Sequence, residues 1–209
     1  MQKVKRKRVH ELDEQTVHPD PIKQFQHWFD EAIAEMLSLP EATTLATATK
    51  DGKPSARLVL LKKVDKKGFV FFTNYNSRKS KELKENPFAT LVFYWEALHR
   101  QVRIEGTVQT IPAKESEEYF QTRTRESQIS AVVSPQSEVV SSREELERRV
   151  DETTKLYDGQ PVPRPSHWGG YRLKPNYIEF WQGQQARLHD RIAYFLRKDG
   201  NWKIKRLAP

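Results

Sequence analysis

The sequence predicts an α+β protein whose main body is an antiparallel β-barrel, closed or partly closed, with helices packed outside it. Seven or eight segments have strand patterning, and short turns join most of them. So many strands would leave costly edges in an open sheet, whereas closure removes them. Helical patterns recur between the strands, and 209 residues suffice for one domain with a substantial core.

The first element is a helix. Asp20 can cap it, and Pro21 suits its first position, where a missing N–H costs nothing. Pro40 closes the segment. Apolar residues recur between them at three- and four-residue steps and predict one buried stripe: Ile22, Phe25, Phe29, Ile33 and Met36.

Strands dominate the next part of the chain. A Gly-containing turn at 50–53 joins two of them into a hairpin, and a second turn at 65–68 leads to the third. A helix over 77–85 follows, with Ser77 as its cap. The strands expected here are 43–49, 55–64, 69–74, 88–95 and 101–111.

The middle is helical and charged. Short helices are expected at 114–122 and 127–133, and a longer one at 142–158, where Ser142 and Glu145 form a capping box. Three prolines between 161 and 165 make a stiff connector. The final strands are expected near 171–173, 177–182, 191–197 and 202–207.

The composition favours anionic partners. The net charge is +8, from 36 Lys and Arg against 28 Asp and Glu, and five of the cations lie in the first eight residues. We expect a basic, mobile N-terminal segment at 1–19 and one domain at 20–209. Cysteine is absent, so neither disulfides nor thiolate metal sites form. No secretory signal or membrane-spanning run is recognised, so we expect a cytoplasmic protein.

The stretch 181–191 concentrates cations. If it is extended, Arg187, His189 and Arg191 point to one side, and Trp181 shares their parity. Cations on a buried ribbon need an anionic partner, and the simplest is a bound anion. The alternative is a solvated strand face with an incidental histidine.

Other cations have phosphate-binding spacing. Arg78 and Lys79 lie in the first turn of a helix, whose free N–H groups favour an anion; the alternative is that both side chains reach into water. Arg57 and Lys62, five residues apart on one strand, would face oppositely and so serve two ligands.

Three further residues are spaced by four. On a continuous helix Tyr119, Arg123 and Ser127 would share one face, although that helix can break near Thr124. The sequence has no zinc spacing, no Walker loop and no Gly-x-Gly-x-x-Gly or Gly-x-Ser-x-Gly motif. A phosphate-bearing ligand would therefore be held by side chains.

An ordered set of short motifs over residues 20–209 resembles the pyridoxine/pyridoxamine 5′-phosphate oxidase family. The order and spacing of the set make it specific, although each motif alone is weak. The motifs are 57–62 (RLVLLK), 77–79 (SRK), 100–103 (RQVR), 136–137 (QS), 180–183 (FWQG), 187–191 (RLHDR) and 206–209 (RLAP).

The resemblance implies an FMN-binding split barrel that acts as a homodimer, with the flavin in a groove between the subunits. It implies oxidation of pyridoxine 5′-phosphate or pyridoxamine 5′-phosphate to pyridoxal 5′-phosphate, with O2 reduced to H2O2. The flavin would supply the redox chemistry, by hydride transfer from substrate C4′ to flavin N5.

The matching motifs also imply the site residues. Arg57, Arg78 and Lys79 would hold the FMN phosphate. The rest of the flavin site would be lined by Leu58, Val59, Leu60, Leu61, Lys62, Phe72, Thr73, Gln101, Gln136, Ser137, Trp181 and Arg191. The substrate phosphate would be bound by Lys62, Tyr119, Arg123 and Ser127, and the pyridine end by Arg187, Leu188 and His189. Arg187 and His189 would be the catalytic pair, with His189 either assisting proton loss or only positioning the substrate.

Two features depart from the family pattern. The basic residues 1–10 include no tyrosine, so no site residue is assigned there. Ser130 and Val132 stand where glycine and tryptophan are expected, beside the substrate phosphate.

Two other functions remain open at this stage. One is a flavin-binding split-barrel reductase or carrier without vitamin B6 activity. The other is a basic barrel that binds single-stranded nucleic acid. The joint presence of Arg123, Arg187 and His189 counts against the first, and the separation of the cations into small clusters counts against the second.

Overall fold

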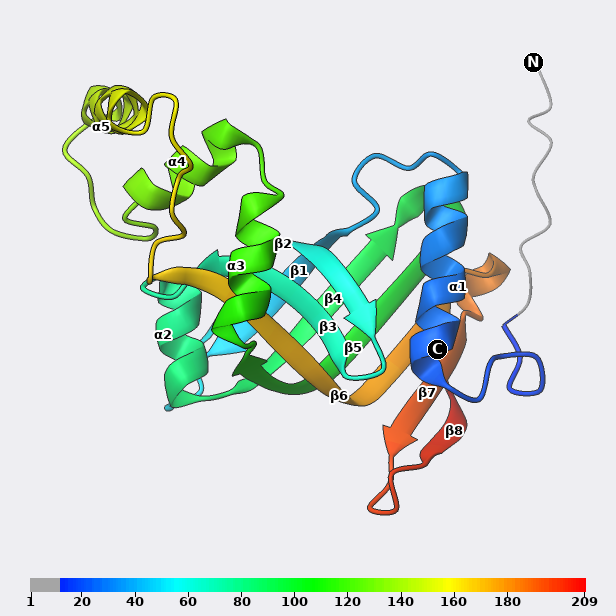
Figure 1. The fold of residues 1–209 in the computed structure, drawn as a ribbon. Coiled ribbons are helices and arrows are strands. Elements are labelled where there is room, and N and C mark those ends of the chain that lie inside the picture. The colour runs from blue at the N-terminus through cyan, green and yellow to red at the C-terminus, as the bar shows by residue number, and fades with distance from the viewer. Residues whose placement is uncertain (1–11) are drawn as a thin grey trace.

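The computed structural model describes residues 12–209 and contains a closed antiparallel barrel (Figure 1). The sheet order is β3-β2-β1-β4-β5-β6-β7-β8, and a further pairing of β3 with β6 closes the first six strands. The predicted barrel with outer helices is confirmed. The strands are β1 (Ala42–Ala48), β2 (Pro54–Asp65), β3 (Gly68–Asn74), β4 (Phe88–Trp95), β5 (Arg100–Thr110), β6 (Trp168–Gln182), β7 (Asp190–Leu196) and β8 (Trp202–Leu207).

The long strand β6 makes closure possible because its two halves have different partners. Residues 168–173 pair with β3 and 177–182 pair with β7, while β5 runs beside both halves. Two separate strands, near 171–173 and 177–182, were predicted here. That prediction was wrong: β6 has one extra, unpaired residue, Asn176, opposite the step from Glu105 to Gly106 of β5, and pairing resumes at Pro175, so the strand continues.

The segment before the first helix packs on the body of the protein. Leu12 and Val17 are buried, so within the predicted mobile segment 1–19 the described residues 12–19 are fixed by contacts. The basic residues at the start of the chain lie outside the described residues. Asp20 caps α1 (Pro21–Ala34) as predicted, since its carboxylate accepts the Ile22 N–H at 2.8 Å.

The buried face of α1 differs from the predicted stripe. Phe25, Trp28 and Ala32 are buried, whereas Ile33 and Met36 are 51% and 89% exposed. The helix ends at Ala34, and Met36 has φ +52°, so the helical periodicity does not reach Met36. The Phe25 ring packs edge-on against Phe69 of β3 at 4.9 Å and thereby joins α1 to the barrel core.

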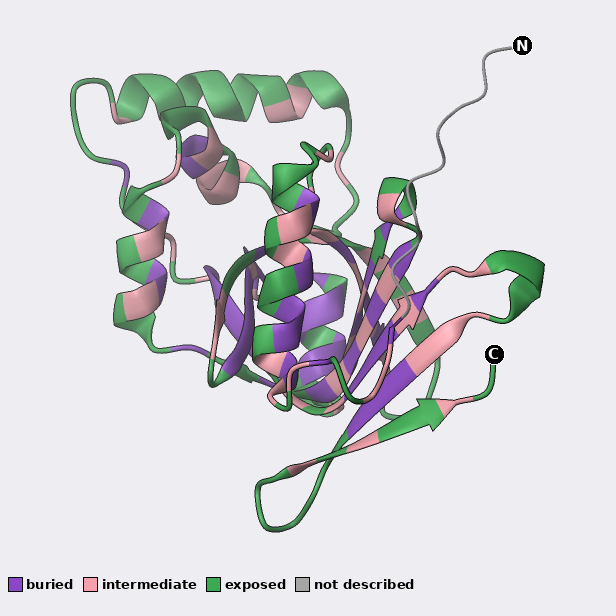
Figure 2. Cartoon of the chain, turned by 90° about the vertical axis from the view of Figure 1, so that its right-hand side faces the viewer, coloured by how far each residue is buried: buried purple, intermediate pink, exposed green. Residues whose placement is uncertain are grey.

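Four more helices lie outside the barrel in the described chain. None of the described helices is long and apolar enough to cross a membrane. The residues of the last, α5, are exposed or half-buried (Figure 2), and even its apolar Leu156 is exposed. The helices are α2 (Arg78–Glu85), α3 (Ala113–Gln121), α4 (Arg125–Val133) and α5 (Arg143–Leu156), with short 3-10 turns η1 (Glu96–Leu98) and η2 (Gln185–Arg187).

Candidate active site

The first pocket, here called the Lys79 pocket, lies between β2, β3 and the N-terminus of α2 and has a volume of about 510 Å³. Nine predicted flavin residues line it, from four different segments of the chain. They are Arg57, Leu58 and Val59 of β2, Phe72 and Thr73 of β3, Arg78 and Lys79 of α2, and Gln136 and Ser137 after α4.

Lys79 is a buried cation without a carboxylate partner among the described residues. Its Nζ donates to Thr73 Oγ1 (3.0 Å), Ser77 Oγ (3.2 Å) and Gln136 Oε1 (2.9 Å), all neutral acceptors. Burial, together with the nearby charge of Arg57, lowers the pKa of Lys79 to about 8. A bound anion would supply the missing counter-charge.

Glu82 organises the other two cations of this pocket. Its carboxylate lies 3.3 Å from Arg57 Nη2 and 2.9 Å from Arg78 Nε. Ser55 and Thr47 donate hydroxyl hydrogen bonds to the same carboxylate, at 2.6 and 2.5 Å. Burial alone would raise the pKa of Glu82, but these hydrogen bonds and the Arg57 charge lower it to about 2. The carboxylate therefore stays charged and holds both guanidinium groups in place.

The charges of the Lys79 pocket match one phosphate group. Three cations and one carboxylate leave two positive charges, and a phosphomonoester carries about −1.5 to −2. The first turn of α2 adds its N–H groups, because Ser77 donates to the Asn74 carbonyl at 2.7 Å and does not cap the helix with its side chain. The residues present thus fit a phosphorylated ligand.

The second pocket, here called the Arg123 pocket, adjoins the first and has a volume of about 310 Å³. Phe72, Thr73 and Gln136 line both pockets. Arg57 lines one and Lys62 lines the other, as the spacing on β2 predicted. Leu61, in contrast, is buried in the barrel core and lines neither pocket. The further lining residues that matter here are Leu60, Tyr119, Arg123 and Trp168.

Arg123 has an unsatisfied buried donor. Its Nη1 is buried without a hydrogen-bond partner, and it forms no ion pair with any residue in 12–209. Burial lowers its pKa, because the charged guanidinium has lost water without gaining a carboxylate. Lys62 approaches Glu41 only at 4.0 Å. The second pocket therefore also carries cationic charge available to an anion.

Ser127 lies apart from the other predicted phosphate residues. The helix breaks, since α3 ends at Gln121 and Thr124 caps α4, so Tyr119, Arg123 and Ser127 do not share one continuous face. The Ser127 hydroxyl accepts a hydrogen bond from Thr124 Oγ1 at 3.0 Å. It does not line the Arg123 pocket, whereas Ser130, one of the departures from the family pattern, does.

The remaining predicted residues form a row across β5, β6 and β7. Gln101 pairs with Trp181, and Trp181 pairs with Arg191, so the three side chains lie on one face of the sheet. The Trp181 and His189 rings lie 4.7 Å apart. The partner of Arg191 is Glu179, at 2.8 Å, so its charge is balanced within the chain.

The prediction of an extended run from Arg187 to Arg191 was wrong. Residues 185–187 form the turn η2, in which Ala186 and Arg187 have φ values of +55° and +61°, and β7 begins only at Asp190. Strand alternation therefore does not orient Arg187, which is exposed, as is Leu188. His189 Nδ1 accepts the Gln184 N–H at 3.1 Å, which fixes the imidazole ring.

This row does not reach either pocket within one chain. Neither pocket is lined by Gln101, Trp181, Arg191 or any residue of 187–189. In Figure 1, α2 and α4 lie on one side of the barrel, and β7 and β8 lie on the other.

Two family models match successive parts of the chain. A family model described as pyridoxamine 5′-phosphate oxidase matches residues 29–157, and one described as pyridoxine 5′-phosphate oxidase C-terminal dimerisation region matches residues 168–209. The chain belongs to the pyridoxine/pyridoxamine 5′-phosphate oxidase family. The chain is therefore an enzyme, an oxidase. Membership of the family implies a flavin cofactor, and the dimerisation region indicates a homodimer.

Individual members of the pyridoxine/pyridoxamine 5′-phosphate oxidase family are closely similar to the chain. A Nostoc punctiforme protein of that name is 57% identical over 95% of this chain and 92% of its own length. The Arabidopsis thaliana pyridoxine/pyridoxamine 5′-phosphate oxidase 1, chloroplastic, is 58% identical over 95% of this chain but only 38% of its own length. The crystal structure of PhzG from Burkholderia lata 383, in complex with tetrahydrophenazine-1-carboxylic acid, has a TM-score of 0.90 and 32% identity and covers 96% of this chain and 99% of that one.

Two carboxylates that hold arginines of the candidate site, Glu82 and Glu179, were missed by sequence reasoning. Glu82 follows Arg78 by four residues, a helical ion-pair spacing that could have been noticed. Glu179 offered no such signal, because its partners Arg103 and Arg191 come from two other strands.

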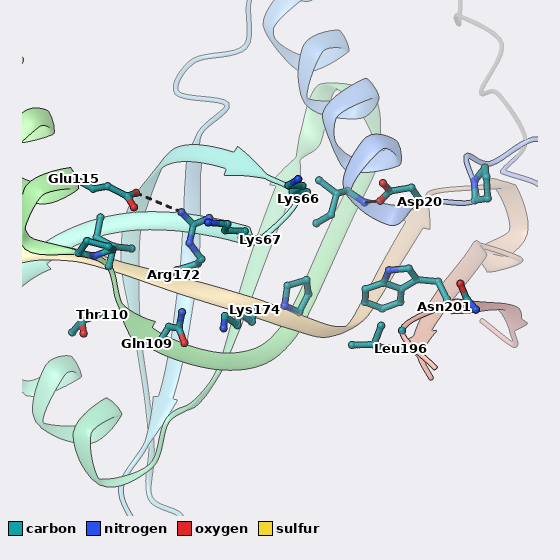
Figure 3. Close-up of a pocket in the computed structure, with 17 residues that line it drawn as sticks. Asp20, Lys66, Lys67, Gln109, Thr110, Glu115, Arg172, Lys174, Leu196 and Asn201 are labelled. Carbon is teal, nitrogen blue, oxygen red and sulfur yellow. Dashed lines mark hydrogen bonds and ion pairs between the residues drawn. The ribbon is translucent and has the colours of Figure 1, made fainter. Parts of the chain in front are cut away.

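A larger pocket, of about 1040 Å³, lies elsewhere in the described part of the chain (Figure 3). It is bounded by the starts of α1 and α3, the β2–β3 turn and the β7–β8 hairpin, and no predicted site residue lines it. Its buried cation, Arg172, is already balanced by Asp65 at 2.5 Å and Glu115 at 3.7 Å. The cations without a carboxylate partner in the described chain therefore lie in the two smaller pockets, not in this one.

Proposed function

We propose that this chain oxidises pyridoxine 5′-phosphate or pyridoxamine 5′-phosphate to pyridoxal 5′-phosphate, with FMN as cofactor and O2 reduced to H2O2. The observation that carries the proposal is the pair of adjoining pockets, each with a cation that lacks a carboxylate partner in the described chain: Lys79 in one and Arg123 in the other. Relatives more than 50% identical carry the name of this activity.

The Lys79 pocket would hold the FMN phosphate. Lys79 gives an uncompensated charge, and Glu82 presents Arg57 and Arg78 in fixed positions. Thr73 and Gln136, which line both pockets, would lie where the flavin meets the substrate. When bound, FMN supplies the hydride acceptor, at N5, and the site of O2 reduction.

The Arg123 pocket would hold the substrate phosphate through Lys62, Tyr119 and Arg123, with Ser127 nearby. Charge-assisted hydrogen bonds contribute about 1.5–3 kcal/mol each, so two or three can anchor a small phosphomonoester. Anchoring the phosphate fixes the distance of C4′ from the neighbouring pocket. Such positioning is the geometric requirement for hydride transfer.

The row of Gln101, Trp181 and Arg191, together with Arg187, Leu188 and His189, would come from the second subunit of the homodimer and cover both ligands. Two observations support this arrangement: the pockets and the row are separate within one chain, and all of these residues except Gln101 lie within the family's dimerisation region, 168–209. FMN would then lie between the subunits.

The hydrogen bonding of His189 favours a positioning role. Because Nδ1 accepts the Gln184 N–H, the neutral ring carries its proton on Nε2. Nε2 would therefore donate to the C4′ oxygen or nitrogen of the substrate and orient it, with Arg187 beside it. The same tautomer is not set up to remove a proton at Nε2.

A flavin and peroxide assay tests the proposal. The purified protein should be yellow, release FMN on denaturation, and form H2O2 from pyridoxine 5′-phosphate. A yellow protein without peroxide would indicate a reductase or carrier, and a colourless protein with salt-sensitive oligonucleotide binding would indicate a nucleic-acid-binding barrel. Near-normal kcat in both Arg187→Ala and His189→Asn at saturating substrate would remove these residues from the mechanism.

A further inference from the structure

Arg123 is held differently from the other arginines of the site. Arg57 is paired with Glu82 and Arg191 with Glu179, whereas Arg123 has no carboxylate partner in residues 12–209. Its guanidinium carbon lies instead 4.6 Å from the centroid of the Trp168 ring. A cation over an indole face is attracted by the electrons of the ring without being neutralised.

Trp168 is a rigid support for this contact. It is 6% exposed, begins β6, and pairs with Asn74 of β3. Its ring is nearly parallel to Phe72 (5.3 Å, 11°) and to Tyr119 (6.3 Å, 6°), and Phe72 stacks on Tyr119 at 3.9 Å. One aromatic stack thus fixes Tyr119 and underlies Arg123, two of the residues assigned to the substrate phosphate.

We propose that Trp168 is a positioning residue that makes the Arg123 pocket selective for phosphorylated over unphosphorylated substrate; this rests on the function proposed above. A carboxylate in its place would hold Arg123 equally well but would cancel its charge and repel a phosphate of about −1.5 to −2. The indole face orients the guanidinium and leaves its full charge for the ligand.

The contact between Arg123 and the Trp168 ring can be weakened in steps by substituting Trp168. Trp168→Phe keeps a smaller aromatic ring, and Trp168→Met keeps most of the volume but has no ring face. Phe120→Leu is the matched control, because Phe120 is buried in the same cluster and packs edge-on against Trp168 but its ring lies farther from Arg123, at 5.8 Å.

The expected result is a change in KM rather than in kcat. For pyridoxine 5′-phosphate, KM should rise about tenfold or more in Trp168→Met, about two- to fivefold in Trp168→Phe, and less than twofold in Phe120→Leu. The kcat at saturating substrate should stay within about threefold, and kcat/KM for unphosphorylated pyridoxine should not change, because that substrate makes no contact with Arg123.

Calorimetric titration with pyridoxal 5′-phosphate and with pyridoxal separates this proposal from the proposed function. Failure of the wild type to form peroxide would reject the function, yet the ratio of the two Kd values would still report on Trp168. The proposal is overturned if Trp168→Met binds pyridoxal 5′-phosphate as tightly as the wild type, or if Phe120→Leu weakens binding equally. Should Trp168→Met not fold, an unchanged Kd in Trp168→Phe also overturns it.

Discussion

At the scale of single residues, Glu82 and Glu179 have the same structural role at two places in the chain. Each is a buried carboxylate that holds two arginines, Arg57 and Arg78 in one case and Arg103 and Arg191 in the other. The hydrogen bonds of these networks lower the pKa of each carboxyl to about 2, against the opposing effect of burial. The arginines are therefore positioned before any ligand arrives, which reduces the ordering cost of binding.

Lys79 gives a pH dependence of cofactor affinity. Its pKa of about 8 means that it loses its proton between pH 7.5 and 9.5, and only the charged form attracts phosphate. Phosphate binding raises the pKa again, so binding takes up a proton and weakens as the pH rises. We expect the Kd for FMN to increase by about 20-fold over this range, measured by quenching of flavin fluorescence.

Two controls isolate the lysine. Lys79→Arg stays charged, so its Kd for FMN should be constant from pH 7.5 to 9.5. Riboflavin, which lacks the phosphate, should show no slope with the wild-type protein. A wild-type FMN affinity that does not change with pH would contradict the assignment of Lys79 to the phosphate.

Residue types and spacing were sufficient to find the cations, but not to tell whether a carboxylate balances the charge of each one. Lys79 and Arg123 were both predicted as anion ligands, yet whether a cation is balanced depends on carboxylates from distant segments. Thr47, Ser55 and Glu82 meet across three elements, and no local pattern records that contact. The folded arrangement was needed to distinguish a paired arginine from a free one.

At the scale of elements, Gly106 of β5 lies opposite the bulge at Asn176 that lets β6 continue past Pro175. A Cβ at Gly106 would lie 2.0 Å from the Lys174 carbonyl oxygen, a backbone atom that cannot move aside. We expect Gly106→Ala to destabilise the protein by about 3 kcal/mol or more, measured by urea unfolding. Gly52→Ala is the control: its φ is +84° but no atom lies within 4 Å, so about 1–2 kcal/mol is expected. Equal losses in the two variants would mean that the bulge is not required.

Glu179 joins three neighbouring strands, because it lies on β6 and binds Arg103 of β5 and Arg191 of β7. With a pKa of about 2, lower than its ordinary 4.5, it adds stability that is present above about pH 4.5 and lost as the pH falls toward 2. Glu179→Gln should therefore cost about 2–4 kcal/mol at pH 7 and clearly less at pH 3.

Urea unfolding at one protein concentration and both pH values checks this expectation. Glu105→Gln is the matched control, since Glu105 also binds Arg103, at 2.5 Å, but is 39% exposed. It should cost less than about 1 kcal/mol. A Glu179→Gln penalty that is as large at pH 3 as at pH 7 would show that packing, not charge, sets the cost.

Sequence periodicity predicted most elements because strands and helices leave repeating patterns, but it failed where the chain departs from a regular element. The run 187–191 contains alternating cations, yet Arg187 ends the turn η2 and the strand begins only at Asp190, since the left-handed backbone of Ala186 and Arg187 interrupts an extended run. The face of α1 was misplaced because Trp28, not Ile33, meets the core, where its ring packs on Phe180. These outcomes depend on contacts between elements.

At the scale of the whole molecule, the outer face of the sheet has features of a contact surface. Leu58 and Tyr94 project from β2 and β4 with 72% and 58% of their surface exposed, and Arg103 and Glu179 form a half-buried network on the same side of β5 and β6. Apolar side chains around charges that are already paired are suited to a subunit interface, because no unpaired charge needs to be buried. The family's dimerisation region includes β6, β7 and β8.

If each active site combines the pockets of one subunit with the row of the other, two inactive chains can repair each other. Lys62→Ala removes a pocket residue, and Arg187→Ala removes a residue of the other half, so each homodimer should be nearly inactive. In a mixed dimer one site carries both substitutions and the other carries neither. Random reassociation of equal amounts makes half of the dimers mixed, so about a quarter of wild-type kcat should return.

The measurement is peroxide formation after co-refolding or co-expression of the two chains with different affinity tags, followed by isolation of the mixed dimer. The isolated mixed dimer should have about half the wild-type activity per dimer. The control is a mixture of Lys62→Ala with Arg123→Ala. Both residues line the same pocket of one chain, so each site of this mixed dimer keeps one defective pocket and no activity should return. Full loss of activity in the mixed Lys62→Ala and Arg187→Ala dimer would place Arg187 in the same site as Lys62 of its own chain. We expect activity to return instead, because the two pockets and the row that contains Arg187 are separate within one chain.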